Sequence, residues 1–183
     1  MIYKSEGRTE RMDWRDRIHN LWVERAVWMR HYSISVMMGL RDLSFVANRL
    51  LRNGTEIAKV ISYFYGAETG NQVENVLTQN ALLLSELAST VKYGGNIEPM
   101  AASWNAISSG ILTVLLQANP YIDKAAWETY LNNHFKLQMD LVLNLSKEKY
   151  SEGITNFDLA YENATKIARS MIDGIEKQFQ FRS

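Results

Sequence analysis

Residues 12–38 read MDWRDRIHNLWVERAVWMRHYSISVMM and indicate the fold of the whole chain. Seven side chains in this stretch are spaced alternately four and three residues apart: Trp14, Ile18, Leu21, Arg25, Trp28, Tyr32 and Ser35. Residues at this spacing share one face of an α-helix, in the manner of helices that pack side by side. Because a mostly apolar helix face must be buried, the stretch predicts a helix packed against others.

The same helical spacing recurs between glycines and prolines along the rest of the chain. We expect six helices, over residues 12–38, 42–65, 68–93, 98–118, 123–150 and 155–178. Thr155 is the expected N-cap of the last helix, with Asp158 three residues later. Gly54 lies inside the second helix and is expected either to kink it or to split it. Since strand-like alternation is absent and the connections are short, the fold class predicted is all-α, an up-and-down helical bundle of about six helices.

The length and composition predict one globular domain. The chain has 183 residues, 46% of them hydrophobic and 22% charged, which is ordinary for a globular protein. We expect the bundle domain to cover residues 12–179, between an N-terminal tail (1–11) and a C-terminal tail (180–183). The absence of cysteine from the sequence excludes disulfides, thiolate catalysis and cysteine-based zinc sites.

Charge and hydropathy indicate which partners to expect. Twenty basic and twenty acidic residues cancel, so no long-range field attracts nucleic acid, and no nucleic-acid partner is predicted. The longest apolar run, Ile111–Leu116, is far shorter than the roughly 18 residues that span a bilayer, so no membrane partner is predicted. Residues 1–17 lack the apolar core of a signal peptide, which makes a cytoplasmic location the expectation.

Polar residues interrupt the inward faces of the predicted helices near mid-length. Arg25 interrupts the first helix, Asn80 the third, and His134 with Gln138 the fifth; Tyr161 lies nearer the start of the last. In antiparallel helices of similar length, residues near the middle lie at similar depth. These five residues are therefore the candidate ligand-binding set.

The chemistry of such a cluster leaves two interpretations open. A buried arginine needs acceptors, because an unpaired buried charge costs several kcal/mol. Either Arg25 and its neighbours form an enclosed polar site, or Arg25 extends along its alkyl stem to water and the amides bond to each other.

Known catalytic motifs are absent, so no catalytic residue is predicted. The sequence contains no glycine-rich phosphate loop, no nucleophile elbow and no His-Glu-x-x-His pair. It also lacks the Glu-x-x-His pairs of di-metal helical bundles. The weak alternative is a metal site formed by His134 with Glu24, Glu56 and Glu162. No cofactor is predicted, and Arg25 disfavours a metal because its permanent positive charge repels cations.

Several short segments resemble a family of uncharacterised bacterial helical proteins. They are Leu21–Arg30 (LWVERAVWMR), Asn48–Asn53 (NRLLRN), Tyr63–Gly66 (YFYG) with Gly70-Asn71, and Tyr130–His134 (YLNNH). The resemblance covers about residues 18–178 and consists of helix-packing patterns. The family has no established activity.

The resemblance implies a bundle interior lined by histidines, which suits a metal or a small ligand. Histidine occupies the positions of Arg25, Asn80 and His134 in the family pattern, and further histidines lie near Tyr161 and Asn163. Of that set this chain keeps only His134. Because Arg25 places a positive charge there, an anion such as a carboxylate is the expected ligand.

Three functions follow from these observations. The first is a non-catalytic helical bundle with an internal polar pocket that binds a small, anionic molecule. The second is a metal-binding, ferritin-like helical protein or enzyme. The third is a structural protein that assembles as a homo-oligomer and whose polar core only sets the register of the helices.

Overall fold

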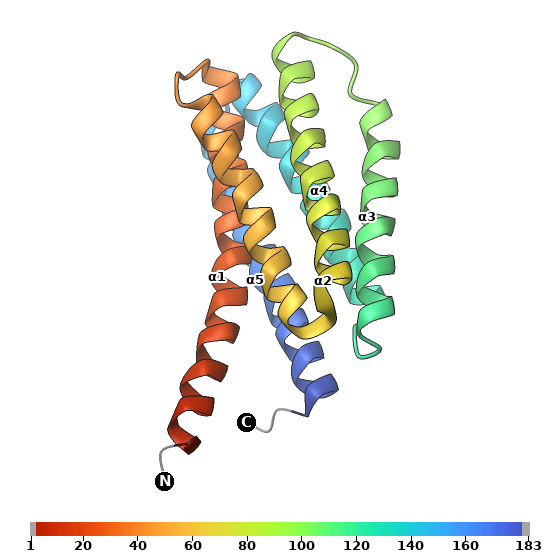
Figure 1. The fold of residues 1–183 in the computed structure, drawn as a ribbon. Coiled ribbons are helices and arrows are strands. Elements are labelled where there is room, and N and C mark those ends of the chain that lie inside the picture. The colour runs from red at the N-terminus through yellow and green to blue at the C-terminus, as the bar shows by residue number, and fades with distance from the viewer. Residues whose placement is uncertain (1–2, 181–183) are drawn as a thin grey trace.

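The computed structural model describes residues 3–180, with side chains from residue 14 onward. Over residues 3–180 the chain forms five helices and no strand: α1 Tyr3–Met38, α2 Leu43–Lys92, α3 Pro99–Ala118, α4 Lys124–Ser146 and α5 Tyr150–Phe179. The helices lie side by side with their long axes roughly aligned (Figure 1). The all-α prediction is therefore confirmed, and the expected number of about six helices is too high by one.

The difference in number arises at Gly66, inside α2. Its backbone is non-helical there, with φ 86° and ψ 164°, and the chain reverses direction. α2 is thus a helical hairpin with a first limb (43–65) and a second limb (67–92) that lie antiparallel (Figure 1). The break expected before Gly66 is real, but the two limbs are joined without a separate loop.

Gly66 is the residue that this turn requires. The combination of positive φ with ψ near 164° is essentially restricted to glycine. We expect Gly66→Ala to lower the free energy of unfolding by about 2 kcal/mol, measured by urea denaturation. Gly153→Ala is the control, because an added Cβ there meets only Leu141 Cδ1, at 3.8 Å. Equal stabilities of the two variants would contradict the assignment of strain to Gly66.

The helix ends at Gly39 and Asp123 agree with the sequence, whereas α1 begins at Tyr3 rather than at residue 12 and α4 ends at Ser146 rather than at residue 150. Gly39 has φ 65° and ends α1, with the Leu40 N–H donating to Ser35 O at 2.9 Å, a Schellman-type end. The Asp123 carboxylate accepts from Ala126 N at 3.1 Å and caps α4. The prediction of Thr155 as an N-cap is wrong: α5 begins at Tyr150, and the Thr155 hydroxyl donates to Ser151 O inside the helix.

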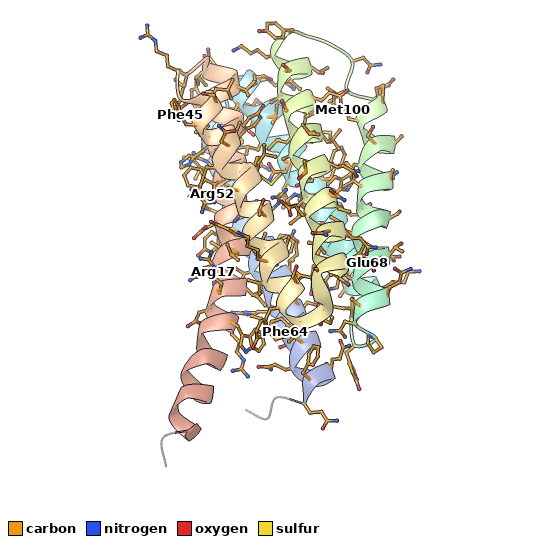
Figure 2. The ribbon with its side chains drawn as sticks, in the orientation of Figure 1. Arg17, Phe45, Arg52, Phe64, Glu68 and Met100 are labelled. Carbon is orange, nitrogen blue, oxygen red and sulfur yellow. The ribbon has the colours of Figure 1, made fainter. Side chains whose placement is uncertain are left out.

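Apolar side chains from all five helices fill the interior (Figure 2). α1 packs on α2, α4 and α5, whereas α3 packs mainly on α2 and α4 and lies at the edge of the bundle. Trp127 is completely buried at the centre of this core, where its Nε1 donates to Ser170 Oγ at 2.9 Å.

Aromatic side chains close the end of the bundle at the Gly66 turn. Phe64, labelled there in Figure 2, packs against Phe179 near the end of α5, with ring centroids 5.8 Å apart. The buried Asn119 donates from Nδ2 to Tyr65 Oη at 2.8 Å, which joins the α3–α4 connection to the same turn.

Among the described residues, one helix, α3, has the length and composition to cross a membrane. Its most apolar window has a mean hydropathy of 1.2 and is 28% buried in the bundle. A single helix of this kind is weak evidence for a span, because core helices also pass such a test. The absence of a membrane partner and the cytoplasmic location remain predictions.

Candidate functional site

Arg25 is buried in the middle of the bundle, which agrees with one of the two interpretations that the sequence leaves open. Its side chain is 2% exposed, and its Nη2 donates to Asn80 Oδ1 and to Leu77 O, both at 2.8 Å. The ion pairs between described side chains do not include Arg25, and its buried Nη1 has no hydrogen-bond partner among them. The interpretation in which Arg25 reaches water is therefore wrong, and the enclosed polar cluster is present.

The guanidinium stays charged despite its burial. Removal from water lowers the pKa of Arg25 to about 10, which is still far above neutral pH. Among the described residues, the guanidinium donates to one carbonyl and one carboxamide oxygen, both from the second limb of α2.

Gly54 lies next to this arginine and to the second limb of α2. A Cβ added at Gly54 would lie 3.4 Å from Leu77 Cβ and 3.7 Å from Arg25 Nη1. α2 remains helical through Gly54, so the expectation that it kinks or splits the helix is wrong. An added Cβ would make only ordinary van der Waals contacts here, so the packing does not require a glycine at this position.

A cavity of about 10 Å³ lies beside the Arg25–Asn80 pair. Its polar lining is Asn80, Trp104, His134 and Gln138, and the rest of its wall is apolar. Trp104 and Gln138 are 2% and 4% exposed, and neither Trp104 Nε1 nor Gln138 Oε1 has a partner among the described residues. Three of the five predicted ligand-binding residues therefore line this cavity together with Trp104, and Arg25 adjoins them through its bond to Asn80.

The sequence did not identify Trp104 as a site residue, because no polar residue was predicted on the inward face of its helix. Its ring stacks on His134 from α4, with centroids 5.5 Å apart and an interplanar angle of 28°. The sequence signal that could have identified it is the single tryptophan on the predicted fourth helix, since a buried indole N–H usually finds an acceptor.

His134 is neutral in this setting. Burial first, and then the charge of Arg25, lower the pKa of His134 to about 3 from its ordinary 6.5. A neutral imidazole has one N–H donor and one acceptor nitrogen. His134 thus faces the cavity without adding charge.

This shift predicts how stability depends on pH. Because the pKa of His134 is lower in the folded state, its contribution to stability is complete above about pH 6.5 and is lost as pH falls toward 3. We expect the free energy of unfolding of the wild-type chain to fall relative to that of His134→Gln as the pH is lowered through this range. Urea unfolding of both proteins at several pH values measures the difference, and parallel pH profiles would contradict the prediction.

The prediction for Tyr161 is wrong. Its side chain is 42% exposed and packs against Phe157 on the outer face of α5. The buried face of α5 instead contains Ala160 and Asn163, and Asn163 Nδ2 donates to Tyr130 O at 3.0 Å. Tyr161 therefore lies off the buried face of α5, although the later positions Ala164, Ala168, Met171 and Ile175 of the same helix are buried.

The residues of the metal alternative are also not brought together. No group of three or more His, Asp or Glu side chains that could hold a metal ion occurs among the described side chains. Glu162 is exposed on α5, and His134 lies at the cavity with Trp104. Glu24 and Glu56 form ion pairs with arginines where α1 contacts α2.

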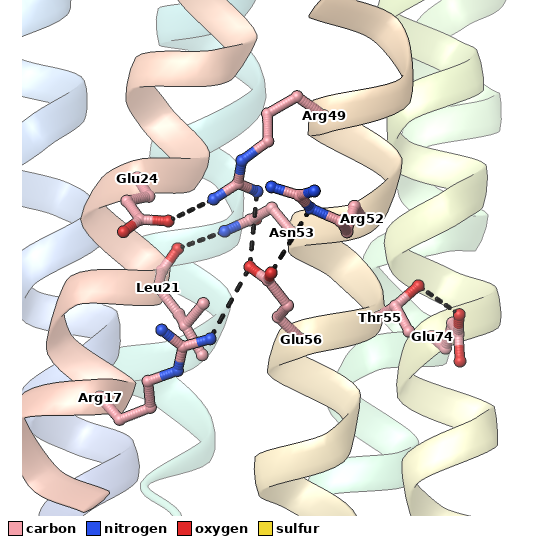
Figure 3. A network of polar contacts seen from close by, with 9 residues as sticks. All are labelled: Arg17, Leu21, Glu24, Arg49, Arg52, Asn53, Thr55, Glu56 and Glu74. Carbon is pink, nitrogen blue, oxygen red and sulfur yellow. Dashed lines mark hydrogen bonds and ion pairs between the residues drawn. The ribbon is translucent and has the colours of Figure 1, made fainter. Parts of the chain in front are cut away.

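This contact is a network of ion pairs at the surface (Figure 3). Arg49 Nη2 lies 2.8 Å from Glu24 Oε2, and Arg49 Nη1 lies 3.4 Å from Glu56 Oε2. Arg52 reaches the second oxygen of Glu56 at 3.6 Å. Asn53, buried beneath the network, donates from Nδ2 to Leu21 O at 2.9 Å. The network attaches the first limb of α2 to α1 and leaves the carboxylates unavailable to Arg25.

A scan against protein-family models, a search of curated proteins and a search of solved structures each gave no match. The resemblance to bacterial helical proteins therefore rests on the segments quoted above.

Proposed function

We propose that the chain is a non-catalytic helical bundle that binds a small anion in its interior. The observation that carries the proposal is the buried, charged guanidinium of Arg25, which has no carboxylate partner among the described side chains. An uncompensated buried charge is costly, so its retention needs a compensating interaction.

The surrounding groups favour an anion over a cation or a catalytic reaction. The charge of Arg25 repels cations. The neutral His134 beside it has no negative charge that would balance a bound cation. The amides, indole and imidazole at the cavity are hydrogen-bonding groups, and none of them is an activated nucleophile.

The test is thermal unfolding in sodium salts of small anions, compared with sodium gluconate at equal ionic strength. We expect the small anions to raise Tm in the wild-type chain and to lose this effect in Arg25→Met. Arg52→Met is the matched control, since it removes the same charge from a side chain that is 67% exposed. Identical anion responses in wild type and Arg25→Met would exclude the proposal.

A second candidate function, assembly as a homo-oligomer, is supported by the outer face of α3. No charged residue occurs from Pro99 to Ile122, and much of α3 is exposed. Between α3 and the second limb of α2 runs an open groove of about 500 Å³, lined by uncharged residues that include Gln72, Asn75 and Thr113. The α3 face of a second chain could pack against this one without repulsion between like charges. In such a two-fold contact the same surface of each chain meets its counterpart.

Light scattering over a range of protein concentrations tests this second function. We expect masses above the 21.1 kDa of one chain, and a return to that mass in Ser109→Arg, which places a charge on the exposed face. Ser151→Arg on the exposed surface of α5 is the matched control. A wild-type mass of one chain at every concentration would exclude assembly through α3.

A further inference from the structure

We propose that Asn53-Gly54, in the first limb of α2, is a modification site that is closed in the folded chain and opens on unfolding. In the unfolded chain Asn53 deamidates spontaneously, and the product no longer refolds to the native structure. This site is separate from the proposed anion site and does not depend on it. Three observations carry the inference: the dipeptide itself, its protection inside the helix, and the hydrogen bond that deamidation removes.

Asn53 is the one asparagine in the sequence that is followed by glycine. Asparagine is a chemically labile residue, and its deamidation begins when the backbone nitrogen of the next residue attacks the carboxamide. Glycine hinders this approach least, because it has no Cβ. Packing does not require the glycine, since a Cβ at Gly54 would lie 3.4 Å from Leu77 Cβ and 3.7 Å from Arg25 Nη1. The helix therefore contains a reactive pair that its packing does not explain.

The reaction balances with water as its only co-reactant. The Gly54 nitrogen forms a bond to Asn53 Cγ, the side-chain amide leaves as ammonia with the proton of the Gly54 N–H, and a cyclic imide remains. Water then opens the ring at one of its two carbonyl carbons. Opening at Cγ gives aspartate, and opening at the main-chain carbonyl gives isoaspartate, in which the main chain runs through the former side chain.

The folded structure prevents this attack in three ways. Asn53 is completely buried, so the water that opens the ring has no access. The backbone of α2 departs from helical angles at Gly66 and not at this pair, and a helical ψ holds the Gly54 nitrogen away from Cγ. The Gly54 N–H is also engaged within the helix, as the donor to the carbonyl four residues earlier. Cyclisation therefore requires this part of α2 to unfold.

Deamidation removes the hydrogen bond that attaches Asn53 to α1. In the native chain Asn53 Nδ2 donates to Leu21 O at 2.9 Å, beneath the ion pairs of Arg49 with Glu24 and Glu56 (Figure 3). Both products carry a carboxylate, which only accepts hydrogen bonds and would face the Leu21 carbonyl without water. Isoaspartate also adds a methylene group to the main chain, which interrupts the helical hydrogen-bond pattern. Neither product restores the contact between α1 and the first limb.

The inference is tested by comparing wild-type protein held folded in buffer with the same protein held unfolded in guanidinium chloride, at one mildly alkaline pH. Peptide mass spectrometry measures the deamidated fraction at Asn53 with time, and circular dichroism after dilution measures the refolded fraction. We expect deamidation to be at least about 1,000-fold slower in the folded sample, because it proceeds only through the unfolded population. The fraction that fails to refold should equal the deamidated fraction. Comparable rates in both samples, or deamidated chains that refold with the wild-type Tm, would overturn the inference.

Gly54→Ala tests the attacking residue. It keeps Asn53 and adds a Cβ that hinders cyclisation, so we expect the deamidation rate of the unfolded chain to fall severalfold and the refolded fraction to rise accordingly. Gly110→Ala is the matched control, because it makes the same substitution at a glycine that does not follow an asparagine. It should deamidate at the wild-type rate. Equal rates in the two variants would overturn the assignment to Asn53-Gly54.

Asn53→Asp reproduces one product without the reaction. We expect its Tm to lie about 5–10 °C below that of the wild type, because a buried donor to Leu21 O is replaced by a carboxylate. Asn48→Asp, at an exposed position of the same limb, is the control and should change Tm by less than about 2 °C. Equal Tm values for the two variants would overturn the effect of deamidation on refolding.

Discussion

Replacement of Gly70 by alanine is expected to lower the free energy of unfolding by about 3 kcal/mol. A Cβ at Gly70 would lie 1.8 Å from Ser62 Oγ and 2.8 Å from the backbone oxygen of Ala58. Ser62 can change rotamer, but the carbonyl of Ala58 belongs to the first limb of α2 and cannot move alone. The two limbs must therefore separate, which disrupts the packing between the Gly66 turn and the polar centre.

Two further variants make this prediction specific. Gly110→Ala places its Cβ 3.8 Å from Val76 Cγ2, an ordinary contact, so it should gain up to about 1 kcal/mol from helix propensity. Ser62→Gly in the Gly70→Ala background should recover part of the lost stability, because it removes the nearest clash. Urea denaturation measures all three. A Gly70→Ala protein as stable as Gly110→Ala would show that the limbs are not packed this closely.

Replacement of Arg25 by methionine is expected to raise the free energy of unfolding by about 2 kcal/mol in gluconate buffer. The arginine must lose its hydration to enter the core and receives only two neutral acceptors in return. Methionine has a similar length and no desolvation cost, and apolar replacements of buried charged groups are often stabilising by 1–4 kcal/mol. The loss of a donor to Asn80 Oδ1 offsets part of this gain.

The acceptor side of this contact provides the control. Asn80→Leu leaves the guanidinium with Leu77 O alone and should destabilise the chain by about 2 kcal/mol. In the Arg25→Met background, the same Asn80→Leu change should be nearly neutral. Urea unfolding in gluconate measures the four proteins. A strongly destabilised Arg25→Met protein would mean that the buried charge contributes to stability without an anion.

Helix phase predicts which polar residues lie on inward faces, but the sequence left open whether Arg25 reaches water. The inward faces of the first, third and fifth predicted helices are long and mostly apolar. Their spacing therefore placed Arg25, Asn80 and Gln138 in the interior, where all three are buried. The cavity could not be predicted, since its volume depends on how Trp104 and His134 stack.

The first half of the last helix was harder to predict from sequence. There the buried face is built from small residues, Gly153, Ala160 and Ala164, so the large Tyr161 was a stronger apolar signal than the neighbouring Ala160. The sequence also did not show that the two limbs of α2 are joined directly at Gly66. Glycine marks a break in a helix, but the sequence does not specify the backbone angles that turn two helices into one hairpin.

The hairpin of α2 has a consequence for the order in which the molecule assembles. Its limbs are linked by a hydrogen bond from Thr55 Oγ1 to Glu74 Oε1, across only 19 positions, whereas the bonds of Arg25 cross 52 and 55 positions. Short loops close at lower entropic cost than long ones, so we expect the hairpin to form early and to offer its acceptors before α1 has docked. Dehydration of the guanidinium is then expected in a late step of folding.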